Sequence, residues 1–206
     1  TEWRDARFAG RLLPFGQVQH PNRVRAADAG IVDGRRYLVM EFIDGIDLSE
    51  LSRRVGRLSI ADACEVIRQS AEGLEHAHQR GIVHRDIKPT NLMLASDGSV
   101  KLHEVDQALL QAEADDLDTE ALTRPDSGPF GTYDYMSPEQ WDNSHSVGPR
   151  GDIYSLGCTL YFLLTGHAPY ERPGYKSPTS KMRGHVLESV PSIREDRSDI
   201  PAELAA

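Results

Sequence analysis

The stretch His84-Arg85-Asp86-Ile87-Lys88-Pro89-Thr90-Asn91 decides the fold of this chain. It holds a carboxylate, an ammonium group and a carboxamide close together in the sequence. Two short apolar runs, Ile82-Val83 and Leu92-Met93-Leu94, flank it, and Asp97-Gly98 then turns the chain into Val100-Lys101-Leu102. We therefore expect a strand, a loop and a hairpin in this order. On its own, the stretch could also be a charged surface turn before a strand.

A second stretch, Gly131-Thr132-Tyr133-Asp134-Tyr135-Met136-Ser137-Pro138-Glu139, follows about fifty residues later. Alone, it could be a tyrosine-rich turn. Together, the two stretches resemble the catalytic loop and the end of the activation segment of protein kinases. The general likeness is to the eukaryotic-type serine/threonine kinases of bacteria, and it runs from about Arg7 to the C-terminus. The resemblance implies an α+β, protein-kinase-like fold, mostly the helical C-terminal lobe with a remnant of the small-lobe sheet.

The resemblance also implies catalytic roles. Phosphoryl transfer depends mainly on positioning and charge neutralisation. Asp86 would accept or orient the substrate hydroxyl, Lys88 would neutralise the transferring phosphate, and Thr132 would bond both residues. Asn91 would reach a magnesium ion. The position of Lys88 resembles serine/threonine kinases rather than tyrosine kinases.

By the same resemblance, ATP would bind at the hinge between the lobes. Met40 would be the gatekeeper, the backbones of Glu41 and Ile43 would bind adenine, and Asp47 could bond a ribose hydroxyl. Met93 would form the floor under the adenine ring. The alternative for the segment before the hinge is a plain buried hairpin.

The sequence departs from the kinase pattern at several positions. Glu104 and Asp106 stand where kinases carry the aspartate and glycine of Asp-Phe-Gly. Glu104 keeps the charge of a metal ligand, but its arm is longer by roughly 1.5 Å, and a misplacement of about 1 Å can lower a rate about a hundredfold. Glu104 and Asp106 could share a cation on an extended chain. Arg11 replaces the glutamate that pairs with the small-lobe lysine, and Pro14 interrupts the expected regulatory helix.

The resemblance also implies two domains. Residues 1–43 would form a partial small lobe and hinge, and residues 44–206 would form the large lobe without its last helices. The given sequence begins after the glycine-rich loop and the small-lobe lysine. It ends before the arginine that pairs with Glu139, so we expect a buried, unpaired carboxylate there.

Periodicity and capping signals predict the remaining elements. The central helix should be apolar over most of its circumference, with Asp152 bonding the catalytic-loop backbone and Gly166 ending it. Ser59 and Gly81 should bound a long amphipathic helix, in which His76 and His78 interact with the helix end or with solvent. The predicted strands are Val24 to Ile31 and Arg36 to Phe42, and the predicted helices are Leu48 to Val55, Ile60 to Gln79, Asp152 to Leu164 and Ser180 to Glu188.

Composition excludes several classes of protein. The chain has 206 residues and a formal net charge of −9, which disfavours binding to nucleic acid or to an anionic membrane surface. Cys64 and Cys158 have no partner pattern, so we expect small core residues and a reducing, cytoplasmic location rather than disulfides. The longest apolar run, Leu160 to Leu164, is too short to span a bilayer. Residues 111–128 are acidic and predict a solvated activation segment facing Arg85.

Two functions remain open. The first is a serine/threonine kinase that uses ATP and Mg²⁺ to phosphorylate a protein. The second is a pseudokinase or scaffold that binds a partner protein without phosphoryl transfer. Asp86, Lys88, Asn91 and Thr132 favour the first, whereas the departures at Arg11, Pro14, Glu104 and Asp106 favour the second. We expect little or no phosphoryl transfer from the chain as given.

Overall fold

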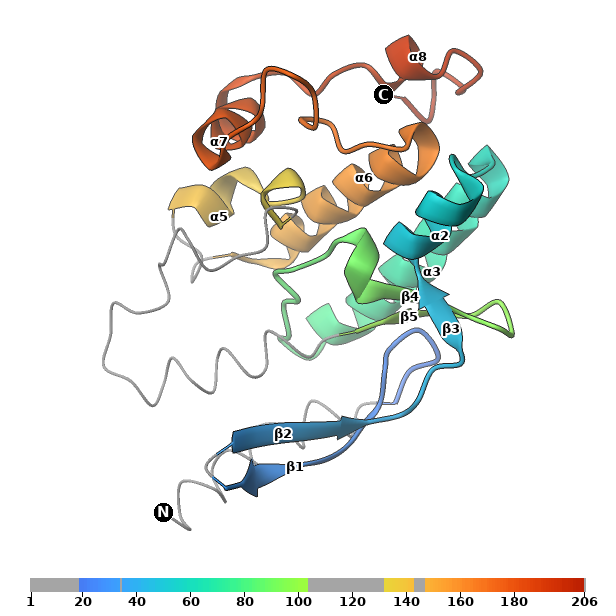
Figure 1. Ribbon diagram of the computed structural model, residues 1–206, viewed down its shortest axis with the longest axis vertical. Helices are drawn as coiled ribbons and strands as arrows, with labels where there is room; N and C mark the ends of the chain where they lie inside the picture. Colours follow the sequence, from blue (N-terminus) through green and yellow to red (C-terminus); the bar gives the residue numbers. More distant parts are fainter. Residues whose placement is uncertain (1–18, 34, 104–131, 143–146, 206) are drawn as a thin grey trace.

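The computed structural model of the protein describes residues 19–33, 35–103, 132–142 and 147–205. Figure 1 shows a small hairpin at one end and a larger, mostly helical body at the other. The predictions made for Arg11, Pro14, Glu104 and Asp106, and for residues 111–128, lie outside the described residues.

The small hairpin consists of β1 (Ala26–Val32) and β2 (Arg35–Met40), which pair antiparallel. Asp33 in the turn has φ 51°, a left-handed conformation that is common in tight hairpin turns. Both strands are confirmed, with each bound shifted by one or two residues. Strand β2 ends at Met40 rather than at Phe42, and Phe42 is 91% exposed.

A separate three-stranded sheet lies in the larger body. Its strands are β3 (Gly45–Asp47), β4 (Leu92–Ala95) and β5 (Val100–Leu102), antiparallel in the order β3-β4-β5. The hairpin β4–β5 turns through Gly98 at φ 86°, and Asp97 accepts a hydrogen bond from the Ser99 amide at 2.9 Å. The sequence predicted this hairpin correctly.

The run Ile82-Val83 was predicted as a strand, and this is wrong, because residues 82–88 have no regular secondary structure. The amide of Ile82 bonds to the carbonyl of Ala77 at the end of the preceding helix. The next amides, those of His84 and Arg85, bond to a side chain of a distant helix. These bonds take the place of pairing with a neighbouring strand.

Most helices follow the local signals in the sequence. The side chains of Asp47 and Ser59 cap α2 and α3, and Gly166 ends α6 at φ 87°. Helix α7 begins before the predicted start because Ser177 caps it. The helices are α2 (Leu48–Val55), α3 (Ile60–His78), α5 (Pro138–Asp142), α6 (Pro149–Thr165), α7 (Pro178–Leu187) and α8 (Ile193–Asp196), with short 3-10 helices at Pro89–Asn91 and Thr132–Asp134.

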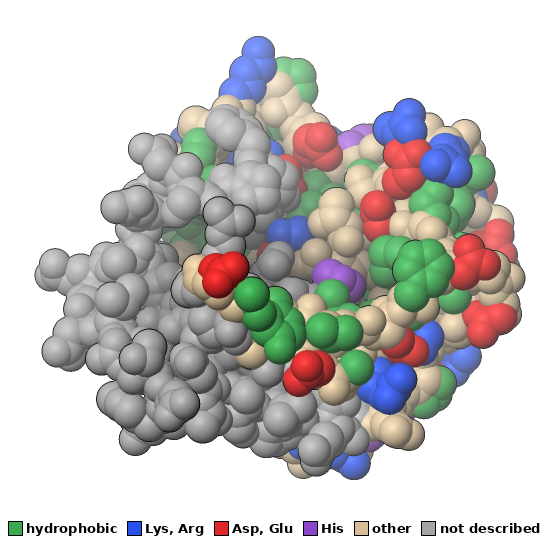
Figure 2. All heavy atoms as spheres, turned by 60° about the horizontal axis from the view of Figure 1, so that its bottom comes forward, with side chains coloured by type: hydrophobic (Ala, Val, Ile, Leu, Met, Phe, Trp, Pro, Cys, Tyr) green, Lys and Arg blue, Asp and Glu red, His purple; other side chains and the backbone are tan. Residues whose placement is uncertain are grey.

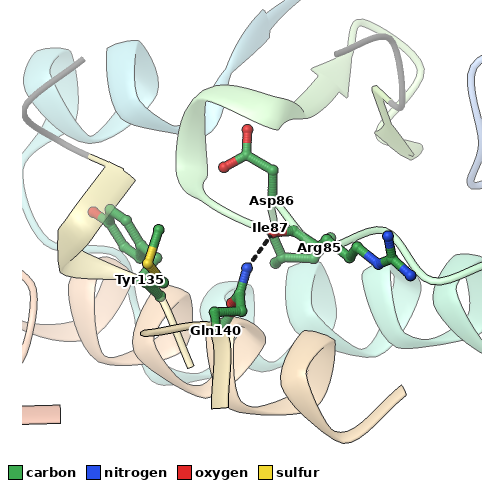
Figure 3. A pocket seen from close by; sticks show the side chains of 7 residues that line it. Arg85, Asp86, Ile87, Tyr135 and Gln140 are labelled. Carbon is green, nitrogen blue, oxygen red and sulfur yellow. Dashed lines mark hydrogen bonds between the residues drawn. The ribbon is translucent and has the colours of Figure 1, made fainter. Parts of the chain in front are cut away.

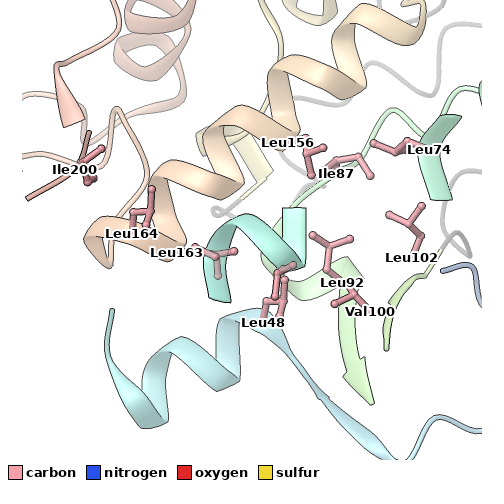
Figure 4. Close-up of a cluster of buried hydrophobic side chains, with 12 residues drawn as sticks. Leu48, Leu74, Ile87, Leu92, Val100, Leu102, Leu156, Leu163, Leu164 and Ile200 are labelled. Carbon is pink, nitrogen blue, oxygen red and sulfur yellow. The ribbon is translucent and has the colours of Figure 1, made fainter. Parts of the chain in front are cut away.

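The hydrophobic core lies between α3, α6 and the three-stranded sheet (Figure 4). Leu163 and Leu164 of α6 are fully buried, which confirms α6 as the central helix. The central helix was expected to be apolar over most of its circumference, but Ile153 near its start is 62% exposed. Its neighbour Asp152 is fully buried, so the next residue, about 100° further around the helix, faces outward. Cys158 is buried and Cys64 is half-buried, and both are free thiols.

The loop before β1 is fastened to the larger body. The side-chain nitrogen Nδ2 of Asn22 donates to Gln69 Oε1 of α3 at 3.0 Å and to the Val100 carbonyl at 2.9 Å. Gly73 of α3 allows this close approach, because a Cβ there would lie 2.6 Å from the Asn22 carbonyl oxygen. Any larger residue at position 73 would force the two segments apart at this crossing.

Charged and apolar side chains are mixed on the face shown in Figure 2, where hydrophobic groups lie among acidic and basic ones. Within the described residues, no helix has the length and apolar character needed to cross a membrane.

Candidate active site

Asp86 lies at the centre of a tight cluster of polar side chains. The Lys88 ammonium group donates to Asp86 Oδ2 at 2.7 Å, and Asn91 Nδ2 donates to the same oxygen at 2.9 Å. The side chains of Lys88 and Asp86 are only 13% and 12% exposed. Three of the four predicted catalytic residues therefore meet at one carboxylate. The fourth, Thr132, begins a 3-10 helix, but its side chain lies outside the described part of the chain.

The orientation of the Asn91 carboxamide follows from its partners. Its nitrogen faces two acceptors, the Asp86 carboxylate at 2.9 Å and the Asp86 carbonyl at 2.8 Å. Carbonyl Oδ1 is then the remaining polar atom of this buried side chain. An amide oxygen is a suitable ligand for magnesium, so Asn91 fits the role of a metal ligand. The second predicted ligand, Glu104, lies outside the described residues, although the preceding His103 donates its amide to the Asn91 carbonyl at 2.9 Å.

Asp152 of α6 holds the loop that carries Asp86. Its carboxylate is fully buried and accepts the amides of His84 at 2.8 Å and Arg85 at 2.6 Å. This confirms the predicted contact between Asp152 and the catalytic-loop backbone. His78 Nε2 lies 2.7 Å from the same carboxylate, and because a carboxylate only accepts, Nε2 carries the hydrogen. The prediction that His78 faces solvent or its own helix end is therefore wrong.

The loop conformation is unusual at the residue before Asp86. Arg85 has φ 65°, a left-handed conformation that few non-glycine residues adopt. Its carbonyl accepts a hydrogen bond from Gln140 Nε2 of α5 at 2.7 Å. A pocket of about 10 Å³ lies beside this bond, and Figure 3 shows Gln140 and Tyr135 on one side of it and the catalytic loop on the other. No local sequence pattern indicates the contact between Gln140 and Arg85, which are 55 positions apart.

The residues predicted for ATP binding lie along the junction between the hairpin and the larger body. Met40 ends β2, and Glu41 and Ile43 follow in the linker. Asp47 and Met93 are direct partners across β3 and β4. One oxygen of Asp47 accepts the Glu50 amide at 2.9 Å as the cap of α2, a second role that the sequence reasoning missed.

The Glu41 side chain has structural partners of its own. It accepts from Lys101 at 2.9 Å and from the Arg25 amide at 2.9 Å. Burial opposes ionisation of this carboxyl, but these two bonds outweigh the burial and lower its pKa. Only the Glu41 backbone was predicted to bind adenine. Its N–H already donates to the Arg25 carbonyl at 2.9 Å, so that prediction now rests on the Glu41 carbonyl.

Helix α7 packs on the segment that carries Thr132. The buried Asp134 forms an ion pair with the buried Lys181. Burial raises the pKa of Asp134, and Lys181 opposes the shift. One turn further along α7, His185 shares a 2.7 Å hydrogen bond with the Tyr154 hydroxyl, and burial lowers the pKa of His185 to about 4.

Glu139 was predicted to be buried and unpaired, but it is exposed.

A comparison with protein families adds to this geometry. The sequence-family model of the protein kinase domain matches residues 12–203 of this chain. This chain belongs to the protein kinase family. The predicted α+β, kinase-like fold and the likeness to bacterial serine/threonine kinases are both confirmed.

Curated relatives of this kinase domain come from several bacteria. The probable serine/threonine-protein kinase PknB of Lactococcus lactis is 33% identical over 199 residues, which are 97% of this chain and 30% of that protein. The serine/threonine-protein kinase PknE of Mycobacterium tuberculosis is 37% identical over 203 residues, 98% of this chain and 33% of that protein. PknH of Mycobacterium bovis is 36% identical over 203 residues, 98% of this chain and 31% of that protein. The chain thus spans about a third of the length of these relatives.

Proposed function

We propose that this domain transfers the terminal phosphate of ATP to serine or threonine hydroxyls of a protein, and that Glu104 in place of the usual aspartate keeps the rate low. The observation that carries the proposal is the Asp86 carboxylate, which is contacted by Lys88 at 2.7 Å and Asn91 at 2.9 Å. A carboxylate, a cation and an amide oxygen are the groups that phosphoryl transfer to a hydroxyl requires. The bacterial serine/threonine kinases among the relatives support the same chemistry.

The two oxygens of Asp86 have different surroundings. Lys88 and Asn91 both donate to Oδ2, so we assign Oδ1 to the hydroxyl of the substrate. Lys88 would neutralise charge on the transferring phosphate, and Thr132 would help to place Asp86 and Lys88. Asn91 and Glu104 would hold Mg²⁺, which supplies the charge neutralisation between the phosphates.

The nucleotide would lie against the junction between β2 and the larger body. Met40 would limit the depth of the adenine pocket, and the backbones of Glu41 and Ile43 would bond the adenine edge. Met93 would lie under the ring, and the Asp47 oxygen that does not cap α2 would bond a ribose hydroxyl. The direct pairing of Asp47 with Met93 across β3 and β4 supports a common binding surface for ring and ribose.

A second candidate is a pseudokinase that binds a partner protein. Glu104 and Asp106 in place of the aspartate and glycine of Asp-Phe-Gly favour it, since magnesium tolerates little departure from octahedral geometry. In this reading the loop around Asp86 serves the fold rather than a reaction.

The decisive experiment incubates the purified protein with ATP labelled at the terminal phosphate, with magnesium or manganese, and with a generic protein substrate. The Asp86→Asn variant keeps the shape of the side chain but cannot accept a proton, so transfer should fall by at least about a hundredfold. Glu104→Asp should raise the rate, by up to about a hundredfold, because it restores the shorter metal-binding arm.

A thermal-shift titration with ATP and magnesium separates the remaining cases. A rise in Tm without transfer by the wild type or by Glu104→Asp would refute the kinase proposal in favour of a nucleotide-binding pseudokinase. No rise and no transfer would indicate a scaffold. Transfer that persists unchanged in Asp86→Asn would also contradict the proposal.

A further inference from the structure

The peptide group between Arg85 and Asp86 is held from both sides. Its carbonyl, that of Arg85, accepts from Gln140 Nε2 at 2.7 Å, and its N–H, that of Asp86, lies 3.3 Å from His84 Nδ1. The orientation of this peptide plane determines the direction in which the Asp86 side chain leaves the backbone. It follows directly after the left-handed Arg85, so it needs external support.

Gln140 is suited to give that support because its carboxamide has one allowed orientation. Its Oε1 accepts the Ser137 amide at 2.9 Å and the Ser137 hydroxyl at 3.0 Å. The backbone N–H of Ser137 can only donate, so the oxygen must face it and the nitrogen must face the Arg85 carbonyl. The backbone N–H of Gln140 also donates to the Ser137 carbonyl at 3.0 Å, so the two residues are joined through both backbone and side chain.

We propose that Gln140 is a positioning residue that sets the orientation of the peptide leading into Asp86. It thereby links the start of α5, in the stretch that resembles the end of the kinase activation segment, to the catalytic loop. Figure 3 shows the Asp86 carboxylate pointing away from Gln140, so Gln140 acts through the backbone and not on the reacting atoms. The catalytic consequence rests on the proposed kinase function, whereas the backbone consequence does not.

The variant Gln140→Glu tests the proposal by replacing one side-chain nitrogen with an oxygen. The side chain keeps its size and the oxygen that faces Ser137, but the atom facing the Arg85 carbonyl becomes an oxygen. An ionised carboxylate would place one acceptor against another, whereas the protonated acid could donate to the carbonyl in the way that glutamine does. The support for the peptide should therefore fail at high pH and return at low pH.

The first readout is the NMR signal of the Asp86 amide between pH 5 and pH 8. In Gln140→Glu it should move with pH and approach its wild-type position at the acidic end. In Gln140→Met, which is of similar size but has no polar atoms to offer, it should be displaced at every pH. The matched control is Gln79→Glu, the same chemical change on an exposed side chain that contacts Glu75, which should leave the Asp86 amide unchanged.

The second readout is the steady-state rate of phosphoryl transfer. At pH 8, Gln140→Glu should lower kcat about tenfold with the KM for ATP nearly unchanged, and the loss should shrink as the pH falls. An Asp86 amide that stays at its wild-type position in Gln140→Glu and Gln140→Met at every pH would overturn the proposal. A wild type without transfer would instead refute the kinase function, and the amide signal would still decide the role of Gln140. Far-UV circular dichroism confirms that each variant is folded.

Discussion

Asp152→Asn is expected to destabilise the protein strongly, because the buried carboxylate accepts from three donors that lie 67 to 74 positions away in the sequence. Two of them, the His84 amide and His78 Nε2, share Oδ2, and the Arg85 amide bonds Oδ1. Asparagine keeps one acceptor oxygen, so its NH₂ group must face at least one N–H. One charge-assisted bond worth about 2 kcal/mol is lost, and the two others weaken by about 1 kcal/mol each.

The sum, about 4 kcal/mol, is reduced by the desolvation that a neutral side chain avoids, so we expect a loss of about 3 kcal/mol in the free energy of unfolding. For a chain of this length that corresponds to a fall in Tm of about 6 to 12 °C. Urea denaturation followed by circular dichroism measures the loss. Asp97→Asn, in an exposed turn, is the control and should change stability by less than about 0.5 kcal/mol. A loss below about 1 kcal/mol for Asp152→Asn would refute the reasoning.

Three further predictions concern stability. His185, with its pKa lowered to about 4, binds its proton more weakly in the folded than in the unfolded state, so stability should fall by about 2 kcal/mol between pH 7 and pH 5. His185→Gln should remove that part of the pH dependence in urea titrations, and an unchanged slope would contradict the assignment. Lys181→Met should cost about 3 kcal/mol by leaving the Asp134 carboxylate buried and unpaired, and adding Asp134→Leu should recover most of the loss in a double-mutant cycle. Gly73→Ala should destabilise by about 1 to 3 kcal/mol because its Cβ would lie 2.6 Å from a backbone carbonyl oxygen, whereas Gly157→Ala, with open space around it, should be neutral or stabilising in thermal melts.

The elements that the sequence predicted correctly are those whose signals are local. Ser59 caps α3, Gly166 ends α6 and Asp97-Gly98 turns the β4–β5 hairpin, and each signal lies within a few residues of the structure that it specifies. The cluster of Asp86, Lys88 and Asn91 could be predicted for the same reason, since all three residues lie in one short loop.

What the sequence missed depends on contacts between distant segments. His78 and Asp152 are 74 positions apart, and Gln140 and Arg85 are 55 apart, so no local pattern announces either bond. The run Ile82-Val83 has the composition of a strand, but its neighbours bond to Asp152 instead of to a sheet. In these cases tertiary contacts override the local preference.

The left-handed backbone at Arg85 has a consequence for the way in which the catalytic loop can fail. Such a conformation lies about 1 to 2 kcal/mol above the ordinary ones for a residue with a side chain, and it persists here between the bonds to Asp152 and Gln140. When either bond is removed, Arg85 can rotate across a backbone torsional barrier to an ordinary conformation of lower free energy. The loop should then exchange between two discrete conformations, rather than showing a gradual increase in mobility.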